Sequence, residues 1–327
     1  MNFVSQMKKS GLETATETTL LFDELPGFDA AAILPRLEPL LDGDPVTVLK
    51  EEVVGRTRYI TLQARGCIVT VEAGNIVRQA AAYFEALDWP MLHRTFPDAE
   101  EVVRGHRSHV HISVEIEYDA VANGLGMRPV NTSFARSVLA GRLAAAVCRI
   151  AMPSAIYWKG CEMLHKPGPF LRELDTEPID LFVRVTPFSS NRQLGGVRMI
   201  GASTRGAFEL LGREVVLEEA PVPVDWAMRT LHGFVARCHH AGGYMPHLAT
   251  YSPSKGDIII VRHLASTPEI QEEHISLEVR RAMEPGFDAT VADGVNTPPK
   301  VTKPAWDGRE RRTRPQTAKP FGRRGLN

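Results

Sequence analysis

The sequence predicts an α+β protein with mixed or antiparallel sheets packed against helices. In the segment 131–151, apolar side chains occur almost all the way round a helix, so we expect that helix to be buried. The segment 154–158 follows directly and is rich in strand-forming residues. Along 109–118, apolar and polar residues alternate, which is typical of a strand with one polar face. Together these segments predict helices layered on sheets.

The part of the chain before residue 105 contains short strand patterns separated by turn and helix signals. Asp29 can cap the first helix, and Arg65-Gly66 predicts a tight turn between two strands. The expected elements are a strand over 18–25, a helix from Asp29, strands over 46–50, 58–63 and 67–72, and helices over 75–87 and 98–104.

The central helix and the second part of the chain repeat this mixture of strands and helices. Asn131 or Thr132 can cap the central helix, and Pro153 ends it. The elements expected beyond it are strands over 179–187, 197–200, 214–217 and 258–262, and a helix over 225–240. The order is consistent with two similar α+β halves, 18–105 and 106–267, within a body that spans 18–267.

Both ends of the chain are expected to lie outside this body. We expect residues 1–17 to form a flexible N-terminus and 268–284 to form one surface helix. The segment 285–327 has too few apolar residues to offset the entropy of ordering it, so it is predicted to be a disordered basic tail. From residue 298 onward, this tail carries nine Lys or Arg residues and two Asp or Glu residues, whereas the whole chain has a net charge of −1.

Composition limits the classes of protein to which the chain can belong. At 327 residues and 43% hydrophobic content, it can bury a sizeable core. The four cysteines form no C-x-x-C pair, which favours a reduced, cytoplasmic environment. No segment reaches the roughly 20 apolar residues of a membrane span, and no phosphate-binding loop motif occurs. We therefore expect no membrane association and no cofactor.

Several short segments, taken in order, resemble a known bacterial family. They are Ile156-Tyr157-Trp158, Leu181–Val185, Gly206-Ala207-Phe208, Leu211–Val215 and Gly256-Asp257-Ile258. Their order is similar to that in the family known as domain of unknown function 4261, over roughly residues 18–267. The resemblance implies an α+β fold and implies no established activity, substrate or catalytic residue.

Two groups of residues could support chemistry. His109 and His111 share one strand face and, with His106, could bind a metal ion. The alternative interpretation is an ordinary polar strand face. Glu162 and His165 follow the aromatic strand and could form an acid/base pair, although loop polarity explains them equally well.

The basic tail suggests a docking element. Its candidate contact residues are Arg311, Arg312, Phe321, Arg323 and Arg324. Nucleic acid is disfavoured as the partner because the remainder of the chain is net negative, so a protein partner with an acidic surface is expected. The leading functional hypothesis is a non-enzymatic cytoplasmic interaction or accessory protein of the immunity or secretion-associated type. The alternative is a metal-dependent or other hydrolase whose site lies on the polar face of the strand 109–117.

Overall fold

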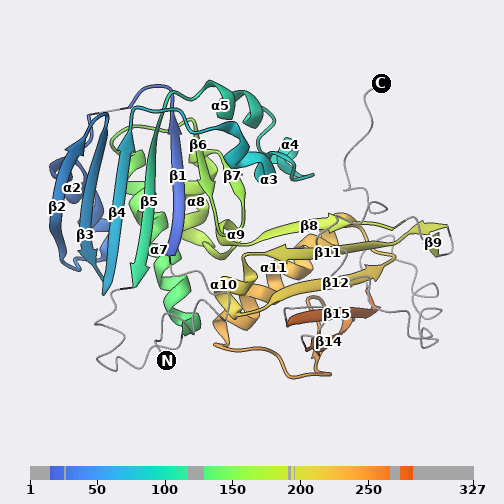
Figure 1. Cartoon of the computed structure of the whole chain (residues 1–327). Helices are drawn as coiled ribbons and strands as arrows, with labels where there is room; N and C mark the ends of the chain where they lie inside the picture. The colour runs from blue at the N-terminus through green and yellow to red at the C-terminus, as the bar shows by residue number, and fades with distance from the viewer. Residues whose placement is uncertain are drawn as a thin grey trace. The chain divides into compact units, whose positions relative to one another are not determined.

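The computed structural model describes residues 15–25, 27–116, 129–190, 193–194, 196–265 and 273–282. The predicted α+β class is confirmed, because helices pack on antiparallel and mixed sheets (Figure 1). The chain divides into two compact units between Arg184 and Val185. The predicted boundary at residue 105 is therefore wrong, since the strand that follows it belongs to the first sheet.

The first unit is built around a seven-stranded antiparallel sheet. Its strand order is β2-β3-β4-β5-β1-β6-β7, so the N-terminal strand lies in the interior of the sheet. The bounds are β1 Ala15–Phe22, β2 Val46–Val54, β3 Thr57–Ala64, β4 Cys67–Gly74, β5 Ser108–Ile116, β6 Ala155–Trp158 and β7 Met163–His165. Arg65 and Gly66 both have positive φ, 51° and 70°, and form the predicted tight turn between β3 and β4.

Helices cover one face of this sheet (Figure 1). They are α2 (Ala30–Leu37), α7 (Pro129–Cys148) and α8 (Pro167–Thr176). The predicted central helix is α7, and its Leu143 and Ala144 are fully buried, as are Val110 and Ile112 of β5. The alternation predicted for β5 thus places its apolar residues against the helices.

Short helical segments complete the first unit. They are η1 (Glu38–Leu41), η2 (Ala80–Tyr83), α3 (Phe84–Leu87), α4 (Leu92–Thr95), α5 (Ala99–Gly105) and α9 (Ile179–Phe182). The helix predicted over 75–87 is helical only from Ala80, and Ile76 is 51% exposed rather than in the core.

The strand predicted over 179–187 is wrong in its first half. Pro178 has φ −62°, which suits the start of a helical turn, and α9 follows it. The strand β8 begins only at Arg184 and ends at Phe188. Both Leu181 and Phe182 are buried, so a short run that is buried on both sides gave no periodicity to separate helix from strand.

The second unit contains a six-stranded mixed sheet in the order β13-β14-β15-β12-β11-β8. Besides β8, its strands are β11 Ile200–Arg205, β12 Glu214–Ala220, β13 Thr250–Tyr251, β14 Ile258–Leu264 and β15 His274–Arg281. Two helices, α10 (Ala207–Leu211) and α11 (Val224–His240), belong to this unit, and a separate pair is formed by β9 (Gln193–Leu194) and β10 (Val197–Arg198).

The surface helix predicted over 268–284 is wrong, because the strand β15 (His274–Arg281) lies in the middle of that segment. This strand pairs with β14 on one side and, in parallel, with β12 on the other. Ile275 and Leu277 are fully buried, and the alternation of apolar residues continues at Val279. The body therefore extends beyond residue 267, and it also begins earlier than predicted, at Ala15.

Candidate functional site

The face of the seven-stranded sheet opposite the helices carries a row of polar side chains. Five residues lie directly opposite one another on five successive strands: Tyr59 (β3), Glu72 (β4), His111 (β5), Thr19 (β1) and Tyr157 (β6). A second row on the same face contains Thr61, Thr70, Ser113 and Glu17. We call these nine residues the polar sheet face. An antiparallel sheet commonly leaves one such face to solvent.

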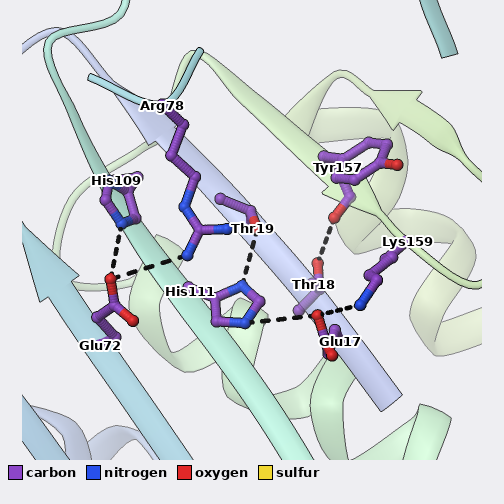
Figure 2. Close-up of polar contacts among 9 residues, drawn as sticks. All are labelled: Glu17, Thr18, Thr19, Glu72, Arg78, His109, His111, Tyr157 and Lys159. Atoms are coloured by element: carbon purple, nitrogen blue, oxygen red, sulfur yellow. Dashed lines mark hydrogen bonds and ion pairs between the residues drawn. The ribbon is translucent and has the colours of Figure 1, made fainter. Parts of the chain in front are cut away.

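His111 lies at the middle of this face and is held by two neighbours on β1 (Figure 2). Its Nδ1 atom is 3.0 Å from Oγ1 of Thr19, and its Nε2 atom is 3.7 Å from Oε2 of Glu17. Burial and, secondarily, the charge of Arg78 lower the pKa of His111 to about 4. The neutral ring can therefore accept a hydrogen bond from the Thr19 hydroxyl while its Nε2–H points toward Glu17.

Glu17 joins His111 to the next strand. Its carboxylate lies 2.7 Å from Nζ of Lys159, the residue that follows β6 (Figure 2). The backbone reinforces this contact, since the N–H of Lys159 donates to the Glu17 carbonyl at 3.2 Å. Histidine, carboxylate and lysine thus form one chain of contacts across three strands.

His109 belongs to a second group, which is centred on Glu72. Its Nδ1 atom is 2.9 Å from the Ile76 carbonyl oxygen and its Nε2 atom is 3.2 Å from Oε1 of Glu72. The guanidinium of Arg78 lies 3.8 Å from the same carboxylate oxygen (Figure 2). Both ring nitrogens of His109 are therefore directed at oxygen atoms of the protein.

His106 has a structural role beside the group centred on Glu72, which it contacts through the backbone of Arg78. Its Nδ1 atom donates to the Val103 carbonyl at 2.5 Å, and its Nε2 atom accepts from the Arg78 N–H at 3.1 Å. This pairing requires a neutral ring, and burial lowers the pKa of His106. Within the ranges that the structure describes, no group of three or more His, Cys, Asp or Glu side chains is arranged to hold a metal ion. The predicted ligand set of His106, His109 and His111 is thus not assembled.

Glu162 and His165 do not form the predicted acid/base pair, because they have different partners. Glu162 lies 3.5 Å from the guanidinium of Arg184, which also donates to the Glu162 carbonyl at 2.9 Å and to the Glu85 carbonyl at 3.1 Å. His165 is buried against the ring of Phe170, and burial lowers its pKa to about 4. Both residues therefore stabilise the fold around β6 and β7.

Sequence reasoning placed His109 and His111 on the polar face and missed the residues that hold them. Glu17 and Thr19 lie in β1, 92 residues or more before their histidine partner, so the contacts depend on the strand order. The sequence Glu17-Thr18-Thr19-Leu20 does not alternate polar with apolar residues, so no local signal indicated which of them face the histidines. The docking residues predicted in 311–324 lie outside the described residues.

Comparisons with known proteins gave no match among family models, curated proteins or solved structures. Of the helices in the described ranges, none is long and apolar enough to cross a membrane. The fold and the site therefore define an α+β protein with an ordered polar sheet face.

Proposed function

We propose that this chain is a non-enzymatic cytoplasmic interaction protein of a bacterial accessory or immunity type, and that it binds a protein partner through the polar sheet face. The observation that supports this proposal is the network on that face, in which Glu17, Glu72 and His111 are each held by residues of neighbouring strands. Side chains that are already fixed lose little conformational entropy when a partner binds. The resemblance to the domain of unknown function 4261 family carries no known chemistry, so the proposal depends on this face.

The extent and chemistry of the face favour a protein over a small molecule. The five-residue row crosses five adjacent strands, and a spacing of about 4.8 Å between strands gives it a length of about 19 Å. Its Tyr59, Glu72 and His111 are half-buried and accessible to a partner, whereas Thr19 and Tyr157 are buried. It presents the Glu72 carboxylate, hydroxyls and the ring of Tyr59, and the Arg78 guanidinium lies 3.8 Å from that carboxylate, a mixture that suits complementary pairing with a protein surface.

A steric block at the middle of the face tests this proposal. Thr70 lies between Thr61 and Ser113 and is half-buried, so Thr70→Arg would place a long cation where the partner is expected to sit. Thr176→Arg is the matched control, because Thr176 lies at the exposed end of α8. In affinity capture from a bacterial lysate followed by direct titration, Thr70→Arg should weaken binding at least tenfold and Thr176→Arg should not. Equal binding by all three proteins would contradict the assignment of the partner to this face.

A second candidate function is supported by one arrangement on the same face. The Thr19 hydroxyl, the His111 imidazole and the Glu17 carboxylate follow one another in the order of a nucleophile, a general base and an orienting acid. In a hydrolase, Oγ1 of Thr19 would attack an acyl carbon while Nδ1 of His111 accepts its proton. Thr19 is only 3% exposed, however, so a substrate would need the face to open. Thr19→Val should abolish hydrolysis of activated esters if this reaction occurs, and hydrolysis at the wild-type rate would exclude Thr19 as the nucleophile.

A further inference from the structure

The strand β2 has features of an unused pairing edge. It is nine residues long, lies at one end of the first sheet and pairs with β3 alone among the described strands. All residues from Thr47 to Val54 are exposed, including four large apolar ones: Val48 (38%), Leu49 (49%), Val53 (60%) and Val54 (60%). A long edge strand with exposed apolar residues is a template for pairing with another strand.

We propose that two copies of this chain associate through their β2 strands, which pair antiparallel across a twofold axis centred on Glu51. The strand itself indicates that its partner is a second copy. When two copies of Val48–Val54 run antiparallel about Glu51, apolar residues lie opposite apolar residues and Lys50 lies opposite Glu52. This inference does not rest on the function proposed for the polar sheet face, which the β2 edge adjoins because Lys50 and Glu52 lie opposite Thr61 and Tyr59.

Geometry restricts the register of such a pair. A twofold axis perpendicular to a continuous sheet keeps each residue on its own side, and residues opposite each other in an antiparallel pair share a side. The axis must therefore pass through a residue position. Centred on Glu51, it places Lys50 opposite Glu52 of the second copy. An axis centred on Lys50, Glu51 or Glu52 in each case places one pair of like charges opposite each other, but only the axis at Glu51 also forms two pairs of opposite charge, Lys50 with Glu52.

Contacts within each copy already hold the charged side chains in the positions that this register requires. Nζ of Lys50 lies 2.7 Å from Oε1 of Glu52, so both side chains already lie on one side of the strand. In the dimer these two pairs would form one group of four alternating charges. Glu51 would face its own copy, and Arg58 on β3, 2.5 Å from its carboxylate, offsets that repulsion in each copy.

A bulge limits the length of the new ladder. The β2–β3 register shifts between Val48 and Lys50, which leaves Leu49 without a partner on β3. The regular ladder between copies is therefore confined to Lys50–Glu52. At each end of this ladder, Leu49 of one copy contacts Val53 of the other. Because this contact is small, we expect a weak dimer that forms as the protein concentration rises.

Charge reversal and charge exchange test the register on the full chain. In sedimentation equilibrium over a range of concentrations, the wild-type chain should be in monomer–dimer equilibrium, and Glu52→Lys should weaken dimerisation at least tenfold. The double variant Lys50→Glu/Glu52→Lys restores opposite charges across the axis and should restore the dimer. Glu100→Lys, on the exposed surface of α5, is the control and should leave the equilibrium unchanged.

A cysteine placed at the twofold axis tests directly, by cross-linking, whether the two β2 strands meet. Glu51→Cys should form an intermolecular disulfide under a mild chemical oxidant, because facing Cα atoms in an antiparallel pair are about 4.5–5.5 Å apart. The four native cysteines are buried, and Glu100→Cys serves as the control that should not cross-link efficiently. A chain that stays monomeric at all concentrations, or a dimer that Glu52→Lys leaves intact, would overturn the proposal.

Discussion

Gly74 lies directly opposite His109 in the β4–β5 pair, and a Cβ atom at Gly74 would be 3.0 Å from Cε1 of the His109 ring. The ring cannot move away freely, because both of its nitrogens are directed at oxygens of Ile76 and Glu72. The absence of a side chain at Gly74 therefore makes room for the histidine and for the contacts it makes on Glu72.

We predict that Gly74→Ala lowers the free energy of unfolding by about 1–3 kcal/mol, the usual cost of inserting a methyl group into a packed site. The control is Gly105→Ala in α5, where a Cβ atom would have no neighbour within 4 Å. That substitution should leave stability unchanged or raise it slightly. Urea unfolding measures both, and equal midpoints for Gly74→Ala and wild type would show that the ring yields without cost.

The sequence predicted the centre of this unit because the patterns there are long and regular. An apolar surface all round 131–151 allowed only a buried helix, and the alternation of β5 placed the two histidines on the polar side. The sequence could not predict the partners of these histidines. The partners of His111 lie on β1, which is placed between β5 and β6 only in the folded sheet. That strand order depends on the whole sheet, and no local pattern around Glu17 or Lys159 indicates it.

Arg184 allows the stability contribution of a buried ion pair to be compared with that of an exposed one. It is buried, donates to the carbonyls of Glu85 and Glu162 and pairs with the Glu162 carboxylate. Arg184→Met removes the cation and these donors from a buried site, which typically costs about 3–5 kcal/mol. Arg104→Met breaks an exposed pair with Glu100 and should cost about 0.5 kcal/mol or less. Similar unfolding free energies for the two variants would contradict a structural role for Arg184.

The low pKa of His111 predicts a dependence of stability on pH. Because its pKa falls from 6.5 to about 4 on folding, the unfolded chain binds more protons between these values. The stabilisation is fully present above pH 6.5 and is lost as the pH falls toward 4. At 1.36 kcal/mol per pKa unit, the loss amounts to roughly 3 kcal/mol.

His111→Gln should therefore show a shallower fall in unfolding free energy between pH 7 and pH 4 than the wild-type chain. The pKa of His165 is also lowered to about 4, and its contribution cancels because it is present in both proteins. Urea unfolding at several pH values gives the difference directly. Parallel curves for the two proteins would mean that His111 remains protonated as readily in the folded chain as in the unfolded one.

The strand β15 shows why one segment was predicted wrongly. Ile275, Leu277 and Val279 alternate with polar residues as a strand requires, but the helix-forming residues around them favoured a surface helix. Its pairing partners, β12 and β14, are formed by earlier parts of the chain, so burial on both sides became visible only in the folded sheet.

The position of β15 between β14 and β12 predicts where the chain can be shortened. A chain ending at Thr267 lacks β15, which leaves two strand edges unpaired and uncovers the surfaces against which Ile275 and Leu277 are fully buried. A chain ending at Glu284 keeps the strand. Both lack the basic segment 285–327, so any difference between them is due to the strand and the residues around it.

We expect the longer chain to melt cooperatively and to resist protease through residue 281. We expect the shorter one to aggregate or to lose its second unit to proteolysis, and equal protease-resistant fragments would contradict the central role of β15.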